Sequence, residues 1–177
     1  MSGSGKSTAI KSLEDIGYVC IDNFPPELIK HLSTLVLKYR EENTTVAITL
    51  DIRSIRSIKE FLTVFDELVE LDISYSVLFL GSCDETLLKR YKETRRLHPF
   101  MEHEPLDLEQ AIRKERDFMK IVKTYSDAVI DTSLIRTAEL KQRLIDLYSE
   151  DSEGKMTINL ISFGFKFGIL KDADNVF

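Results

Sequence analysis

Short apolar runs alternate along the chain with longer stretches that repeat apolar residues at helical spacing. The runs are rich in β-branched residues and predict strands at Tyr18–Ile21, Thr45–Leu50, Tyr75–Leu80 and Asp127–Ile130. The stretches between them predict helices over Pro25–Arg40, Ser54–Leu71, Glu109–Lys123 and Arg136–Tyr148. Strands joined by crossover helices pair in parallel, so the pattern predicts an α/β fold with a parallel sheet flanked by helices.

The pattern changes near residue 150 and divides the chain in two. A polar break at Asp151–Gly154 precedes the apolar stretch Lys155–Ile161 and the aromatic stretch Ser162–Gly168, with no helical pattern after them. We expect residues 1–150 to form one domain and residues 151–177 to begin a second, truncated domain. The periodicity also allows the alternative that this stretch is an edge strand of the first sheet.

A phosphate-binding loop is predicted at the start of the chain. The stretch GSGKST at Gly3–Thr8 matches the end of the pattern G-x-x-x-x-G-K-[ST], and helical periodicity follows it at once. The backbone amides would surround a phosphate, Lys6 would reach the β- and γ-phosphates, and the Ser7 hydroxyl would bind Mg²⁺. The predicted nucleotide-binding residues of the loop are Ser2, Gly3, Ser4, Gly5, Lys6, Ser7 and Thr8. The alternative is a flexible N-terminus rich in glycine and serine.

The first glycine of this pattern, and the strand that normally leads into such a loop, would fall before Met1. We therefore expect the first strand of the sheet, its central one, to be missing from this chain. Its neighbours would lose backbone hydrogen bonds and apolar burial worth about 1.5–3 kcal/mol for each large side chain. Because proteins are stable by only about 5–15 kcal/mol, we expect the chain alone to be weakly stable and to bind nucleotide weakly.

Acidic residues come directly after two predicted strands, at the edge where ligands of parallel sheets bind. Asp51 is a candidate Mg²⁺ ligand and catalytic residue, and Arg53 beside it is a candidate for binding phosphate and for catalysis. Asp22 follows the strand before it in the chain and is a further catalytic candidate. Either carboxylate could instead cap the helix that follows it, a common role for aspartate.

A basic stretch at Lys89–Arg96 contains five positive residues and one negative residue. In phosphate-transfer enzymes, arginines of a mobile lid close over the transferred phosphate, and Arg90, Arg95 and Arg96 are catalytic candidates for that role. The pair His98-Pro99 is expected to end the helix that contains this stretch. A solvated helix face and a patch for RNA phosphates are the alternatives that the sequence leaves open.

Composition narrows the class of protein. The chain has 177 residues, of which 43% are hydrophobic and 31% charged, as in globular proteins, and no run approaches the ~18 apolar residues of a membrane span. There is no secretory signal pattern, and Cys20 and Cys83 lack metal-ligand spacing, so we expect a cytoplasmic protein with reduced thiols and no membrane partner. The net charge of −6 argues against a globally basic nucleic-acid-binding protein.

Several stretches of the chain resemble the RapZ/YvcJ family, bacterial P-loop nucleotide-binding proteins described as RNase adaptors. The matching stretches are SGSGKSTAIKSLEDIGYVCIDNFPPELI, DIRS, LLKRYKETRRLHPF, VIDTS and SFGFKFGILKDADNVF, in family order from residue 1 to residue 177. The resemblance implies a kinase-like P-loop NTPase fold for the first domain. It also implies that SFGFK begins a C-terminal domain associated with RNA binding.

The resemblance further implies an activity and partners. The expected activity is binding and slow hydrolysis of ATP or GTP with Mg²⁺, at the loop and at Asp51, Ile52, Arg53 and Ser54. The expected role is regulation of small RNAs or of envelope-precursor metabolism through RNA or protein partners, with monomer or homo-oligomer left open. The alternative enzyme is a small-molecule kinase in which Asp22 is the base for a substrate hydroxyl. A non-catalytic module that binds RNA or protein is the third hypothesis.

Overall fold

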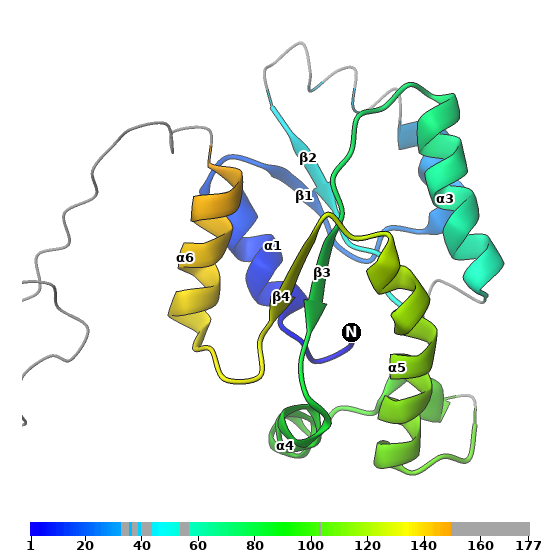
Figure 1. Ribbon diagram of the computed structural model, residues 1–177, viewed down its shortest axis with the longest axis vertical. Helices are drawn as coiled ribbons and strands as arrows, with labels where there is room; N and C mark the ends of the chain where they lie inside the picture. Colours follow the sequence, from blue (N-terminus) through cyan, green and yellow to red (C-terminus); the bar gives the residue numbers. More distant parts are fainter. Residues whose placement is uncertain (33–35, 37–38, 40–43, 54–56, 103, 150–177) are drawn as a thin grey trace, which may run out of the picture.

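The computed structural model describes residues 1–32, 36, 39, 44–53, 57–102 and 104–149, and these residues form an α/β fold (Figure 1). The helices are α1 (Lys6–Asp15), α3 (Ile58–Glu70), α4 (Asp84–Thr94), α5 (Leu108–Thr124) and α6 (Thr137–Tyr148), with 3-10 turns η1 (Pro26–Leu28) and η2 (Pro99–Glu102). The strands are β1 (Val19–Ile21), β2 (Val46–Ile48), β3 (Leu78–Gly81) and β4 (Ala128–Asp131). Every predicted strand is therefore present, although each is shorter than or shifted from its predicted range.

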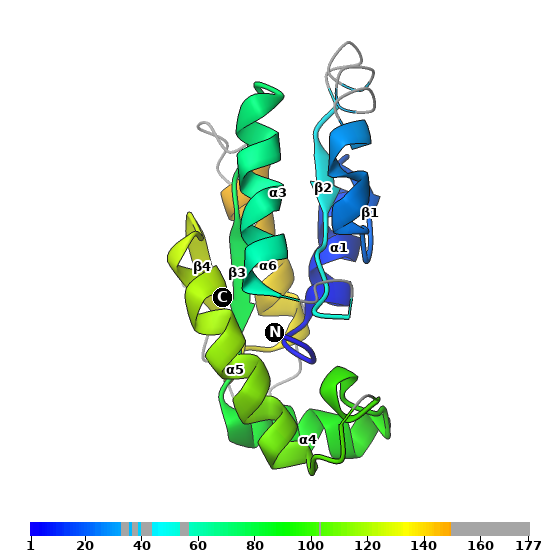
Figure 2. The ribbon, with the colours of Figure 1, turned by 90° about the vertical axis from the view of Figure 1, so that its right-hand side faces the viewer.

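The strands form two separate pairs within the described residues. β1 pairs with β2 in parallel, with Val19 opposite Val46, and β3 pairs with β4 in parallel, with Leu78 opposite Ala128. Figure 2 shows the two pairs apart, with β2 on one side and β3 and β4 on the other. The parallel pairing is confirmed, whereas a single continuous sheet is not found in this part of the chain. The strand expected before Met1 stays a prediction.

Local sequence explains where several helices begin and end. Asp107 and Gln110 form a capping box at the start of α5, and the Ser57 side chain accepts the Glu60 amide at the start of α3. α4 ends at Thr94 because Arg95 adopts a left-handed conformation with φ 53°. The prediction that His98-Pro99 ends this helix was therefore wrong by one turn.

The predicted helix over residues 25–40 is only partly described. Residues 26–28 form η1 and residues 29–32 continue as α-helix. Most of the rest of the predicted range lies outside the described residues, as does Ser54 at the start of the next predicted helix. The later helices agree with their predicted ranges to within a few residues.

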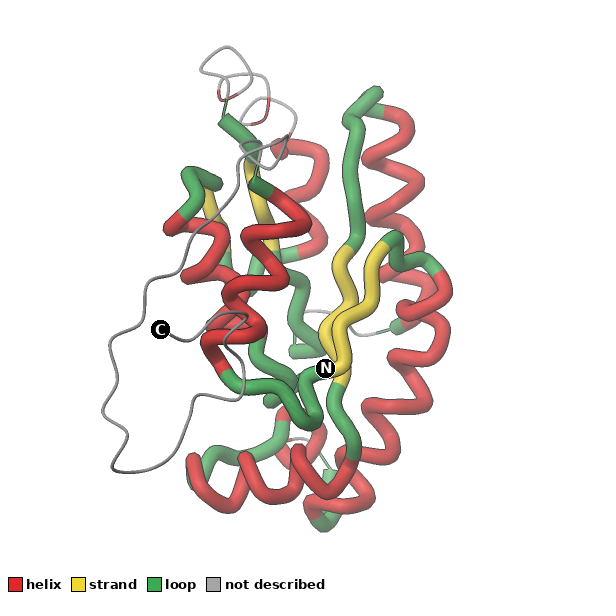
Figure 3. The backbone as a smooth tube through the Cα atoms, turned by 60° about the vertical axis from the view of Figure 1, so that its left-hand side comes forward, coloured by secondary structure: helices red, strands yellow, loops and turns green. Residues whose placement is uncertain are grey.

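Apolar side chains pack on both faces of the β3–β4 pair. Successive side chains of a strand point to opposite faces, and the neighbours Phe79 and Leu80 accordingly lie in two different buried clusters. Phe79 packs with residues of α3, α4 and α5, whereas Leu80 packs with residues of α1 and α6. Figure 3 shows the strands in the middle with helices on both sides. None of the described helices is long and apolar enough to cross a membrane.

The packing of α6 on α1 predicts the effect of a core substitution. Leu144 is fully buried, and Leu144→Ala should lower the free energy of unfolding by about 2–5 kcal/mol because it removes packed side-chain volume. Leu147→Ala, on the same helix but 54% exposed, is the matched control and should cost much less. Urea unfolding followed by circular dichroism measures both. Equal costs would contradict the packing described above.

Candidate phosphate-binding site

The loop before α1 has the backbone conformation that its glycines allow. Gly3 and Gly5 have φ angles of 76° and 102°, in the left-handed region that other residues rarely adopt. A Cβ atom at Gly5 would also lie 3.2 Å from the Leu140 side chain. The loop turns next to the carboxyl end of β3 and leads directly into α1 (Figure 1). The backbone conformation therefore favours glycine at position 5, and a larger residue would also require a small shift of the Leu140 side chain.

The amide groups at the start of α1 are available to a ligand. Among the described residues, no acceptor binds the backbone N–H groups of Gly5, Lys6 or Ser7. Thr8 and Ala9 are the first to donate into the helix, both to the Gly5 carbonyl. Unbound amides at a helix N-terminus, together with the helix dipole, favour an anion such as phosphate. This part of the loop therefore has the chemistry that its sequence predicts.

The serines of the loop differ in their surroundings. Ser7 is exposed, as a ligand of Mg²⁺ would need to be. Ser2 and Ser4 are buried, and the Ser4 hydroxyl donates to the Met1 carbonyl at 2.6 Å. The Ser2 amide donates to Glu115 and the Ser4 amide donates to the Met1 carbonyl, so a contact of these two serines with phosphate stays a prediction.

The loop lysine forms an ion pair with the acid that follows β2. Lys6 Nζ lies 2.7 Å from Asp51 Oδ2, and the Arg53 amide donates to Asp51 Oδ1 at 3.1 Å. Burial raises the pKa of Asp51, but the charge and hydrogen bond of Lys6 and the hydrogen bond from Arg53 outweigh it. The pKa of Asp51 therefore lies below its usual range, and the carboxylate is charged at neutral pH. The structure thus brings together three of the predicted site residues.

Two other predicted residues near the strand ends, Asp22 and Ile52, are not part of this ion pair. Asp22 is exposed and accepts hydrogen bonds from the Asn23 amide and the Thr49 hydroxyl, which tie together the ends of β1 and β2. Ile52 is 4% exposed and packs in the core, so that only its backbone could contact a ligand. Ser54 lies outside the described residues.

The predicted lid arginines do not act as one group in this structure. Arg90 donates from Nη1 to the Gly3 carbonyl and from Nη2 to the Thr132 carbonyl, at 3.0 and 2.7 Å. It is therefore fixed against the back of the loop. Arg95 and Arg96 lie exposed beyond the end of α4, and in the described part of the chain neither forms an ion pair. Their proposed contact with phosphate stays a prediction.

A buried carboxylate beneath the loop was missed by the sequence analysis. Glu115 of α5 is fully buried, accepts the Ser2 amide at 2.7 Å, and lies 3.1 Å from Nε2 of His98, which is also fully buried. The Phe100 amide donates to His98 Nδ1, so we assign the His98 proton to Nε2, from which it is donated to Glu115. No motif singles out Glu115, because its partners lie far away in the sequence.

The charge of Glu115 depends on these partners. Burial raises the pKa of Glu115. The hydrogen bond from His98, the nearby amino-terminal charge and the hydrogen bond from the Ser2 amide together lower this pKa by more than burial raises it. The net result is a pKa below the usual range, so the carboxylate is charged at neutral pH. Glu115 therefore anchors the start of the loop as a buried anion.

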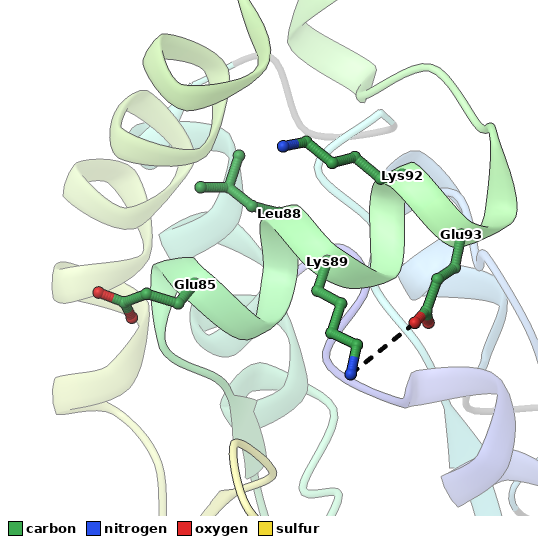
Figure 4. A pocket seen from close by; sticks show the side chains of 5 residues that line it. All are labelled: Glu85, Leu88, Lys89, Lys92 and Glu93. Atoms are coloured by element: carbon green, nitrogen blue, oxygen red, sulfur yellow. Dashed lines mark ion pairs between the residues drawn. The ribbon is translucent and has the colours of Figure 1, made fainter.

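Two hollows lie near these residues. One of about 150 Å³ opens beside the loop and is lined by Ser4, Thr8 and Arg90 and by residues that connect β4 to α6, such as Ile135 and Arg136. The other, of about 580 Å³, is lined only by side chains of α4, including Lys89, which pairs with Glu93 (Figure 4). A surface formed by a single helix has no convergent polar groups from other elements, so only the smaller hollow belongs to the site.

The donor set also bears on metal binding. Within the described residues, no group of three or more His, Cys, Asp or Glu side chains could hold a metal ion. Mg²⁺ in phosphate sites typically needs only one or two protein ligands, with phosphate oxygens and water completing its shell. One carboxylate, Asp51, and one exposed hydroxyl, Ser7, therefore fit Mg²⁺ held together with a nucleotide.

Comparison with known proteins gives one consistent result. The model of the RapZ-like N-terminal domain matches residues 1–152. A nucleotide-binding protein of Caldicellulosiruptor bescii is 42% identical over 178 aligned residues, which cover 100% of this chain and 61% of the relative. Nucleotide-binding proteins of Caldicellulosiruptor saccharolyticus and Staphylococcus aureus are 39% and 40% identical and are covered over 61% and 59% of their lengths. The chain thus spans about three fifths of these relatives.

The buried carboxylate predicts a pH-dependent stability. Glu115→Gln should lower the free energy of unfolding at pH 7 by about 1–3 kcal/mol, because an amide cannot satisfy both donors as a carboxylate does. The pKa of Glu115 is lower in the folded protein than in the unfolded chain, where it is about 4.3. The stabilisation from the Glu115 charge is therefore complete above the unfolded pKa and is lost as the pH falls through the lower pKa of the folded protein. The difference between wild type and variant should therefore shrink in acid.

Urea unfolding at pH 7, 5 and 3 measures this difference. Glu109→Gln, at an exposed position of the same helix, is the matched control and should change the free energy of unfolding little at any of these pH values. A difference between wild type and Glu115→Gln that is constant from pH 7 to pH 3 would show that the Glu115 charge is not stabilising.

Proposed function

Because this chain belongs to the family of RapZ-like N-terminal domains, we propose that it binds a nucleoside triphosphate, ATP or GTP, at the loop before α1. The observation that carries the proposal is the row of unbound amides at Gly5, Lys6 and Ser7, next to the Lys6 ammonium group. Amide N–H groups and an ammonium group are donors of the kind that bind phosphate oxygens. The relatives named nucleotide-binding proteins support the same class of ligand.

The proposed fold is that of a kinase-like P-loop NTPase. The parallel strand pairs, the helices on both faces and the glycine-containing loop at the carboxyl end of β3 support it. The Met1 amino group donates to the Leu80 carbonyl at 2.9 Å, so the backbone that leads into the loop lies against β3. The proposal includes a strand at this position that pairs with β3 and leads into the loop.

Lys6 has to change partners when a nucleotide binds. In the structure its charge is balanced by Asp51, and in the proposed complex it is balanced by the β- and γ-phosphates. Ser7 and Asp51 would hold Mg²⁺, which neutralises charge on the phosphates. Arg53 is exposed next to Asp51 and is proposed to stabilise charge during slow hydrolysis.

The role of the longer protein is also a proposal. Members of this family described as RNase adaptors suggest control of small RNAs or of envelope-precursor metabolism through RNA or protein partners. In this chain the exposed residues Lys92, Arg95 and Arg96 offer a cationic surface for phosphates of RNA. The kinase alternative depends on Asp22, whose Oδ1 accepts hydrogen bonds from Asn23 and Thr49 at an exposed position.

Replacing the loop lysine tests the proposed phosphate site. Lys6→Ala should weaken binding of Mg²⁺–ATP and Mg²⁺–GTP by about tenfold or more, because a hydrogen bond to a charged group is lost. Isothermal titration calorimetry of the full chain measures this. The matched control is Lys11→Ala, at an exposed position of the same helix, for which we expect unchanged affinity. Nucleotide binding that is unaffected by Lys6→Ala would refute the site.

Replacing Asp51 should have opposite effects with and without Mg²⁺. Without the metal, Asp51→Asn should strengthen nucleotide binding, because Lys6 no longer has to give up its ion pair with Asp51 before it binds phosphate. With Mg²⁺, the same variant should weaken binding, because the proposed carboxylate ligand is lost. Calorimetry with and without EDTA compares the two conditions. A change of the same sign in both conditions would argue against a double role of Asp51.

A further inference from the structure

The peptide unit between Ser4 and Gly5 contains the first of the unbound amides in the proposed phosphate site. Its N–H group belongs to Gly5, and its carbonyl belongs to Ser4, which is fully buried. In a planar trans peptide the C=O and N–H groups point in opposite directions. A contact that holds the Ser4 carbonyl inside the protein therefore also directs the Gly5 amide outward, where the proposed phosphate would lie.

The loop backbone does not by itself fix this orientation. Rotating the peptide unit changes ψ of Ser4 and φ of Gly5, and Gly5, with φ 102°, has no Cβ atom to oppose the change. The reversed peptide would present the Ser4 carbonyl to the ligand, and the partial negative charge of its oxygen would repel phosphate. The partner of this carbonyl therefore decides which orientation is favoured.

The Thr132 hydroxyl is that partner. Thr132 follows β4 and is 2% exposed, and its hydroxyl lies 3.0 Å from the carbonyl oxygens of both Ser4 and Gly81. The Gly81 carbonyl already accepts the Thr132 amide at 2.8 Å. In the part of the chain that the structure describes, no other group donates to the Ser4 carbonyl. The hydroxyl proton is thus needed more by Ser4 than by Gly81.

Arg90 limits where the Thr132 hydroxyl can donate. Nη1 of Arg90 donates to this hydroxyl at 3.0 Å, and Nη2 donates to the Thr132 carbonyl at 2.7 Å. A guanidinium group has donors only, so the hydroxyl can accept from Arg90 but cannot donate to it. The hydroxyl proton is therefore left for the carbonyl groups of Ser4 and Gly81.

We propose that Thr132 is a positioning residue of the nucleotide site. Its hydroxyl, oriented by Arg90, holds the Ser4–Gly5 peptide so that the Gly5 amide is directed at phosphate. The inference rests on the proposed binding of nucleotide at the loop. Thr132 acts through the loop backbone and is not among the site residues that the sequence predicts.

A purely structural link is the competing interpretation, because the same contacts join α4 to the end of β4. Loss of the hydroxyl would then lower the stability of the fold without changing the phosphate affinity of the folded protein. Thr86 offers a matched comparison, since its hydroxyl donates to the Ser133 carbonyl at 3.2 Å and also joins α4 to the segment after β4. Among the described residues, the Thr86 hydroxyl has no partner in the phosphate loop.

Calorimetry of the full chain with Mg²⁺–ATP and Mg²⁺–tripolyphosphate separates the two interpretations. Thr132→Val keeps the shape of the side chain but removes the hydroxyl. It should weaken binding of both ligands by about tenfold or more, and by similar factors, because a donor to a charged phosphate is misdirected. Thr132→Ser restores the hydroxyl and should recover most of the affinity. Thr86→Val is the control and should bind both ligands as wild type does.

Urea unfolding establishes that each variant is folded under the conditions of the titration. A folded Thr132→Val variant that binds both ligands like wild type would overturn the inference while the phosphate loop stands. The same holds if Thr132→Ser binds as weakly as Thr132→Val, or if Thr86→Val weakens binding as much. Wild type that binds neither ligand would overturn the proposed function, and the inference with it.

Nuclear magnetic resonance of the unmutated chain gives a second test that needs no variant. Mg²⁺–tripolyphosphate should move the Gly5 amide proton downfield, because this amide gains an acceptor. The Ser4 amide, which donates to the Met1 carbonyl at 3.3 Å, should move much less. A Gly5 resonance that stays in place while those of Lys6 and Ser7 move would overturn the inference and leave the phosphate loop standing. No movement of any of these resonances would overturn the proposed function itself.

Discussion

The candidate site depends on side chains that hold the phosphate loop from behind. A loop that turns its amides toward a ligand directs carbonyl groups the other way, into the protein, where they need donors. Arg90 donates to the Gly3 carbonyl, and Thr132 donates to the Ser4 carbonyl at 3.0 Å. Glu115 accepts the buried Ser2 amide at the start of the loop. Without these contacts the loop backbone would have buried polar groups without partners.

These contacts join the loop to separate parts of the fold. Arg90 belongs to α4, Thr132 follows β4, and Glu115 belongs to α5 and is itself bound to His98. Thr132 also lies 3.0 Å from the Gly81 carbonyl at the end of β3. The loop conformation is therefore tied to the β3–β4 pair and to two helices. Arg90, which the sequence pattern assigns to a lid, donates in this structure to the Gly3 and Thr132 carbonyls.

The sequence predicted what depends on neighbours in the chain. The loop, the start of α1 and the position of Asp51 after a strand all follow from local patterns, and the structure places Lys6 and Asp51 together. The partners of Glu115 and Thr132 could not be predicted, since the Ser2–Glu115 and Ser4–Thr132 contacts join residues 113 and 128 positions apart. The end of α4 was misplaced because a left-handed arginine, which is uncommon, ended the helix before the proline.

The Lys6–Asp51 pair also explains why the proposed function requires a divalent cation. Both side chains are largely withdrawn from water, with 21% and 17% of their surface exposed, so each charge needs a nearby counter-ion. A triphosphate that takes Lys6 leaves Asp51 as a partly buried carboxylate facing further negative charge. Coulomb repulsion between the Asp51 carboxylate and the phosphates opposes binding unless a cation lies between these negative groups. In the proposed complex, the dependence on Mg²⁺ therefore arises from the acid that neutralises the lysine when no nucleotide is bound.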